Sequence, residues 1–180
     1  MGKKTVQPKF NFETVDWTQI DQIKAELIYE EAKDVQRGIF ESFAVLNSKA
    51  FNFLTLAMAM ISAIIGYVLI EWAHLSVPLL VAAATFSGLI FISILCFIVC
   101  VWPKGVVPAS AEPMAYLENG YYRNDYLAVI KGNIRAICGG IDHNKAVEYH
   151  RKFWFQFALM VLTAAPVGGL LAFSVTLAFV

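Results

Sequence analysis

The sequence predicts an all-α membrane protein with three transmembrane helices and a cytoplasmic helical layer. Three uncharged runs predict the spans: Phe51–Ile70, Leu75–Trp102 and Phe153–Val180. Each run reaches the roughly 20 apolar residues that a helix needs to cross a hydrocarbon core of about 30 Å. The chain of 180 residues is 58% hydrophobic and only 16% charged, with a mean hydropathy of +0.60, which excludes an ordinary soluble domain.

These runs divide the chain into four segments. Residues 1–49 are an N-terminal cytoplasmic segment with an amphipathic helix, and residues 50–102 are a transmembrane helical hairpin. Residues 103–152 are a cytoplasmic linker with helices, and residues 153–180 are the third transmembrane helix. The hairpin follows from the turn Glu71–His74, because four residues between two long helices allow only an antiparallel return.

The distribution of basic residues predicts the orientation. Seven of the fourteen Lys and Arg residues precede the first span, and the other seven lie between Lys104 and Lys152. The turn between the first two spans has none. The positive-inside rule therefore places the N-terminus and residues 103–152 in the cytoplasm and the C-terminus outside.

A long helix is expected before the first span. Asp16 with Gln19 three residues later matches a capping box, which predicts a helix start at Asp16. Apolar residues then recur at roughly helical spacing without a proline, and they predict a single helix of about fifty residues that runs into the membrane. These residues are Ile23, Leu27, Val35, Ile39, Phe43 and Leu46.

A short heptad seam is predicted in the second cytoplasmic segment, on a helix that starts near Arg123. Leu127, Ile130, Ile134, Ile137 and Ile141 are spaced three, four, three and four. This seam could drive oligomerisation, or it could pack on the helix of residues 20–46 in the same subunit. We expect Gly139-Gly140 to interrupt the helix and Asp142 to cap a new one.

Small and weakly polar residues form one face of the first span and one face of the third. Such faces allow helix backbones to approach closely in lipid. The first face could pack against another span, which we favour, or line a pore in an oligomer. The residues are Asn52, Thr55, Ala59, Ser62 and Gly66 in the first span, and Ala164, Gly168 and Ala172 in the third.

Basic and aromatic residues of the second cytoplasmic segment form a candidate ligand site. Cations can pair with phosphate groups, and aromatic rings can stack on bases. The alternative, which we favour, is intramolecular pairing with the acidic face of the N-terminal helix around Glu26 to Asp34. The candidate ligand-binding residues are Arg123, Tyr126, Lys131, Arg135 and Lys145.

Enzymatic activity is not expected. The sequence has no nucleophile elbow, no phosphate-cradling glycine loop, no His/Cys cluster with metal-ligand spacing and no charge within a span. His143 and His150 lie seven residues apart on one helical face, and we interpret them as polar surface. No cofactor and no metal are therefore predicted.

A family resemblance becomes visible in the order of these elements. The junction Asn47-Ser48-Lys49-Ala50, together with Ile130, Asn133, Ile137 and Lys145, resembles the Pycsar effector transmembrane family and the related SLATT domains. These are small membrane effectors of bacterial antiphage systems. The layout is also similar to the membrane channel of the Hailong system, which is held shut by a nucleic-acid product of its partner.

This resemblance implies a multi-pass protein of the bacterial inner membrane. The expected function is a homo-oligomeric channel or membrane-disrupting effector, a tetramer as a first estimate, in antiphage defence. Its cytoplasmic helices would respond to a nucleotide or oligonucleotide ligand made by a partner enzyme, or to the partner itself. The alternative is a membrane-anchored scaffold or sensor subunit without a pore of its own.

Overall fold

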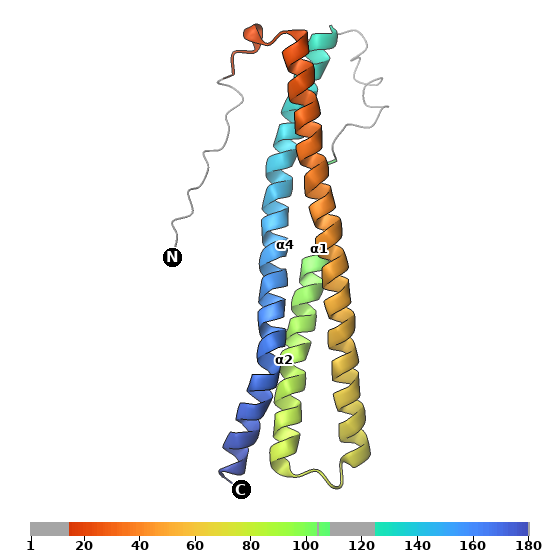
Figure 1. The fold of residues 1–180 in the computed structure, drawn as a ribbon, viewed down its shortest axis with the longest axis vertical. Coiled ribbons are helices and arrows are strands. Elements are labelled where there is room, and N and C mark those ends of the chain that lie inside the picture. The colour runs from red at the N-terminus through yellow and green to blue at the C-terminus, as the bar shows by residue number, and fades with distance from the viewer. Residues whose placement is uncertain (1–14, 104, 109–124, 180) are drawn as a thin grey trace. The chain divides into compact units, whose positions relative to one another are not determined.

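The computed structural model describes residues 15–103, 105–108 and 125–179, and this part of the chain is helical with no strand. A short 3-10 helix, η2 (Trp17–Gln19), precedes three α-helices (Figure 1). These are α1 (Gln22–Glu71), α2 (Val77–Val101) and α4 (Tyr126–Leu177). All three are long and apolar enough to cross a membrane, so the chain is an all-α, multi-pass membrane protein.

The chain forms two compact units. We call the first, which comprises residues up to Gly38 and Val107–His143, the helical layer. The second, the membrane unit, comprises Ile39–Val106 and Asn144–Val180. Both α1 and α4 contribute residues to each unit.

The start of α1 differs from the prediction. Asp16 does act as a cap, since its carboxylate accepts hydrogen bonds from Thr18 N at 3.1 Å and from Gln19 Nε2 at 2.9 Å. It caps only the 3-10 turn, because Ile20 is extended and breaks the helix. Asp21 then caps the second helix start by accepting from Lys24 N at 2.9 Å, and α1 runs for the predicted 50 residues.

Three phenylalanine rings, one from each α-helix, meet inside the membrane unit. The ring centroids of Phe53 and Phe97 are 6.0 Å apart, and Phe155 lies 6.0 Å from the first and 5.8 Å from the second. Such offset and edge-to-face contacts add to the packing of large side chains. Around them lies a core that includes Leu46 and Ala57 of α1.

The two spans of the hairpin are joined as predicted. His74 N donates to Glu71 O at 2.8 Å, which closes the turn after α1. Ser76 is the N-cap of α2, and Pro78 lies in the first turn, where no backbone donor is needed. At the other end of α2, Trp102 N donates to Ile98 O at 2.9 Å.

The heptad seam of α4 packs within the subunit. Ile130 and Ile134 are buried against Ala25 in the core of the helical layer, which supports the intrasubunit alternative. On α1, three residues of the apolar series, Ile23, Leu27 and Val35, are exposed. Smaller or polar residues of the same helix are buried in their place: Ala25, Ala32 and Gln36.

Gly139-Gly140 does not interrupt α4, and Asp142 lies inside the helix instead of capping a new one. The second glycine is required by a close approach. A Cβ on Gly140 would lie 2.9 Å from Val107 Cγ1, whereas one on Gly139 would meet nothing within 4 Å. The same Val107 accepts a hydrogen bond from the buried Gln36 side chain at 2.9 Å, so the linker after α2 is fixed against both helices of the layer.

This contact predicts different effects for the two adjacent glycines. Gly140→Leu should destabilise the protein by about 1–3 kcal/mol, because the new side chain overlaps Val107. Gly139→Leu is the matched control, and it should be neutral or stabilising by up to about 1 kcal/mol, since glycine is a poor helix former. Unfolding midpoints of both variants in detergent would measure the difference. Equal midpoints would contradict the assigned role of Gly140.

Candidate functional site

The small-polar face of the first span lies opposite the face of α1 that packs inside the membrane unit. Asn52, Thr55, Ala59 and Ser62 are exposed. Each follows a residue of the packed face by two positions, and two residues turn a helix by about 200°. Those packed residues are Ala50, Phe53, Ala57 and Met60.

Gly66, which is half-buried, continues this face. A Cβ added there would meet no atom within 4 Å. We call Asn52, Thr55, Ala59, Ser62 and Gly66 the α1 stripe. Since α2 and α4 of the same subunit pack on the other side of α1, the stripe is free to contact a second molecule.

The small residues of the third span are divided between two environments. Ala165 is fully buried, and Gly169 is buried where a Cβ would lie 3.3 Å from Phe86 Cβ of α2. A Cβ on Gly168 would lie 2.6 Å from Leu89 Cδ1, so this predicted packing residue also faces α2. Of the other two predicted residues, Ala164 is exposed and Ala172 is half-buried. These contacts show that α4 uses small residues mainly for packing inside the subunit.

A buried arginine joins the three helices of the membrane unit. Arg151 on α4 is only 5% exposed. One terminal nitrogen lies 3.3 Å from the carbonyl oxygen of Trp102, the C-cap of α2, and the other lies 3.5 Å from Asn47 Oδ1 on α1. The guanidinium also lies 5.0 Å from the ring centroid of Phe43. We call these four residues the arginine clamp.

The charge of Arg151 is balanced by dipoles and a ring instead of by an acid. None of the ion pairs between described residues includes it, and its Nε has no hydrogen-bond partner. The last carbonyl groups of a helix lack intrahelical donors and carry a partial negative charge. The guanidinium therefore stabilises the C-terminal end of α2 and ties it to α1 and α4.

An acidic residue one turn before Arg151 links α4 to α1. Glu148 accepts hydrogen bonds from Ser42 on α1 and from Lys152, which lies 2.6 Å away. Burial raises the pKa of Glu148, but the hydrogen bonds from Lys152 and Ser42 outweigh burial, and the net pKa lies below its ordinary value. The carboxylate is therefore held ionised next to the membrane.

Two of the candidate ligand-binding residues hold the segment before α1. Lys131 donates to the backbone carbonyl of Trp17, and the Arg135 guanidinium lies 4.8 Å from the centroid of its ring. Tyr126 lies elsewhere in the layer, beside Glu26. The charge of Glu26 is the main cause that raises the pKa of Tyr126, and burial adds to it. These contacts bring Lys131 and Arg135 together and give Tyr126 an acidic neighbour.

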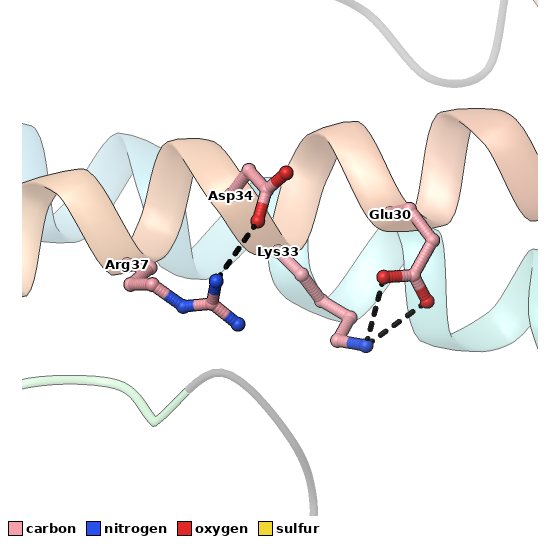
Figure 2. Close-up of polar contacts among 4 residues, drawn as sticks. All are labelled: Glu30, Lys33, Asp34 and Arg37. Carbon is pink, nitrogen blue, oxygen red and sulfur yellow. Dashed lines mark hydrogen bonds and ion pairs between the residues drawn. The ribbon is translucent and has the colours of Figure 1, made fainter.

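The remaining candidates do not join this group. Lys145 is exposed and belongs to the membrane unit, and Arg123 lies outside the described residues. The acidic face of α1 pairs along its own helix, with Lys33 Nζ 3.0 Å from Glu30 and Arg37 NH1 3.4 Å from Asp34 (Figure 2). The charge pairing that we favoured, between these bases and the acidic face of α1, is not seen among the described residues, whose ion pairs each join residues no more than one turn apart. The acidic face instead has Tyr126 beside Glu26.

The sequence interpretation missed the residues of the arginine clamp and its neighbour Glu148. Arg151 was grouped with the bases before the third span, and its burial has no local sequence signature. A weak signal existed in Gln36, Phe43 and Asn47, which follow one another at spacings of seven and four and so lie on one face of α1. Within the described residues no group of three or more His, Cys, Asp or Glu could hold a metal ion.

Comparison with family models, with characterised proteins and with solved structures finds no match for this chain.

The clamp predicts that lysine cannot replace Arg151. Lysine keeps the charge but lacks the planar fork that reaches both Trp102 O and Asn47. Arg151→Lys should destabilise the protein by about 1.5–3 kcal/mol, the range for hydrogen bonds of charged groups. The reciprocal exchange at the next residue, Lys152→Arg, keeps the pair with Glu148 and should be nearly neutral. Unfolding midpoints in detergent compare the two, and equal effects would contradict the clamp.

The lowered pKa of Glu148 predicts an acid-sensitive contribution to stability. The contribution is present above the ordinary value of 4.5 and is lost as the pH falls through the lowered folded-state pKa. Glu148→Gln keeps an acceptor for Ser42 but cannot titrate. Its unfolding midpoint should therefore fall less than that of the parent protein between about pH 7 and about pH 3.5. Identical pH dependence of the two proteins would contradict the assignment.

Proposed function

We propose that the chain is a homo-oligomeric membrane channel or membrane-permeabilising effector whose subunits meet through the α1 stripe. The exposed position of the stripe, on the side of α1 opposite the intrasubunit core, is the observation that supports this proposal. Lipid tails are as apolar as leucine, so small and weakly polar residues gain by contacting another helix or water. Four exposed residues and Gly66 offer such a face over about four turns of helix.

Gating would pass through the two long helices. Both α1 and α4 continue without a break from the helical layer into the membrane unit. A ligand or partner that binds one state of the layer better than another would shift the equilibrium between closed and open spans. Lys131 and Arg135 are the described bases that we propose for ligand binding. They lie together and contact the carbonyl oxygen and the aromatic ring of Trp17, so a ligand that bound them would change the contacts of the segment before α1.

The biological setting is supported by sequence features. The concentration of basic residues before the first span and between the second and third supports a cytoplasmic N-terminus and an external C-terminus. The resemblance of the Asn47–Ala50 junction and of residues 130–145 to antiphage membrane effectors supports a location in the bacterial inner membrane. It also supports a nucleotide or nucleic-acid signal from a partner enzyme as the trigger, and a tetramer as a first estimate of the assembly.

Bulky substitutions in the stripe test this proposal. Ser62→Leu with Gly66→Leu should abolish or reduce at least tenfold the ion flux of purified protein in liposomes, because leucine keeps the neighbouring helix at a distance. The same variant should run as a smaller species in size-exclusion chromatography. Thr163→Leu with Val167→Leu, on an exposed face of α4, is the matched control and should conduct and assemble normally.

Two results would count against the proposal. If the double variant Ser62→Leu and Gly66→Leu assembled and conducted like the parent protein, the stripe would face lipid. If the parent protein left vesicles tight under every condition, including addition of the partner enzyme and its products, the chain would be the membrane-anchored scaffold instead.

A further inference from the structure

The packing of the membrane unit is strongly uneven along its length. The segment between the buried residues Ala57 of α1 and Ile90 of α2 includes the whole hairpin turn. Within this segment only Pro78 is buried. By contrast, the other half of α2 contributes six of its seven buried residues, between Ile90 and Cys100. We call the loosely packed part, nearest Glu71–Ser76, the hairpin half.

Two open clefts between α1 and α2 occupy this hairpin half. Their volumes are about 510 and 440 Å³. Both are lined by Ile64 and Val68 of α1 and by Ala83 of α2. The larger cleft also includes Trp72 and Ser87, and the smaller one extends to Phe173 of α4.

Small residues explain why the clefts remain open. Gly168 and Gly169 bring α4 against Leu89 and Phe86 of α2. In contrast, α1 lies apart from α2 at the hairpin end (Figure 1). Ala83 of α2 lines both clefts, and its short side chain does not reach across to α1. The clefts therefore remain between α1 and α2, and the smaller one is also bordered by α4.

The lining determines the chemistry of an occupant. The side chains that border the two clefts carry no charge, and nearly all of their surface is apolar. The volumes fall within the range of about 300–1,000 Å³ that small-molecule sites show. Unfilled space of this size forfeits dispersion contacts on every wall, so an apolar occupant would be stabilising.

We propose that both clefts bind the acyl chains of membrane lipids. The clefts lie in segments that the hydropathy assigns to the membrane, where acyl chains are the surrounding medium. Trp72 borders the larger cleft beside the turn, and tryptophan prefers the level of the lipid headgroups. A phospholipid can thus keep its headgroup at the interface while one acyl chain enters between α1 and α2.

A second copy of the chain is a poorer occupant. The α1 stripe lies on the side of α1 opposite Ile64, which lines both clefts, so a helix seated on the stripe leaves the clefts unfilled. The lipid sites are therefore independent of whether the assembled protein conducts ions. Bound lipid would also affect the motion of the spans. A motion that brings α1 onto α2 must expel an acyl chain, so a bound acyl chain would favour the arrangement in which α1 and α2 are apart.

Photo-crosslinking of the full-length protein tests this assignment. The protein is reconstituted in phosphatidylcholine–phosphatidylglycerol vesicles that contain a trace of phosphatidylcholine with a diazirine on one acyl chain. Labelled peptides are then mapped by mass spectrometry. Labelling should concentrate in residues 64–72 and 79–87 and saturate as the probe fraction rises. Ala83→Phe, which narrows both clefts at the α2 residue that lines them, should lower it at least fivefold, and Ala83→Leu should lower it less.

Ala63→Phe is the matched control, since Ala63 is exposed on α1 and lines neither cleft. It should leave the labelling of residues 64–72 and 79–87 unchanged. Labelling that is spread evenly over the exposed faces of all three helices and is unaffected by Ala83→Leu and Ala83→Phe would overturn the proposal.

Discussion

The membrane unit is organised around the buried cation Arg151, which has no carboxylate partner among the described residues. Arg151 is 5% exposed and contacts the C-cap carbonyl of α2, the Asn47 amide and the Phe43 ring. A buried charge is tolerated only when surrounding dipoles replace its hydration. The end of α2 supplies such a dipole, so the arginine clamp fixes where α2 ends and which faces of α1 and α4 meet it. The same unit holds the phenylalanine contacts and the buried Ser93 of α2, whose hydroxyl donates to Ala158 O at 2.8 Å.

With the clamp in place, α1 has two opposite roles. Near the clamp, one face of α1 packs on α2 and α4. Toward the hairpin, the same face lines two apolar clefts between α1 and α2. The opposite face carries the α1 stripe. A helix that is tightly held at one end and loosely packed at the other can tilt without breaking the core. The proposed gating would use this freedom, because the spans could change their contacts while the core near the clamp stays intact.

Much of the fold could be predicted because membrane solvation imposes simple rules. Uncharged length predicts the spans, and a four-residue turn predicts the hairpin. Predictions failed where a side chain's neighbours decide its role. Ile23 and Leu27 are bulky and apolar yet exposed, whereas Ala25 is buried against Ile130 and Ile134 of α4. Gly140 resembled a helix break, yet it makes room for Val107. The position of the stripe relative to the packed face of α1 followed only from the structure, because periodicity alone does not show which face a partner covers.

Disulfide crosslinking in native membranes tests the central claim most directly. In a background with the three cysteines replaced by alanine, Ala59→Cys places a thiol on the α1 stripe, and Ala57→Cys places one on the buried face two residues away. Mild oxidation should link the Ala59→Cys protein into dimers and leave the Ala57→Cys protein monomeric on denaturing gels. Monomeric Ala59→Cys protein, or equal crosslinking at both positions, would contradict an assembly through the α1 stripe.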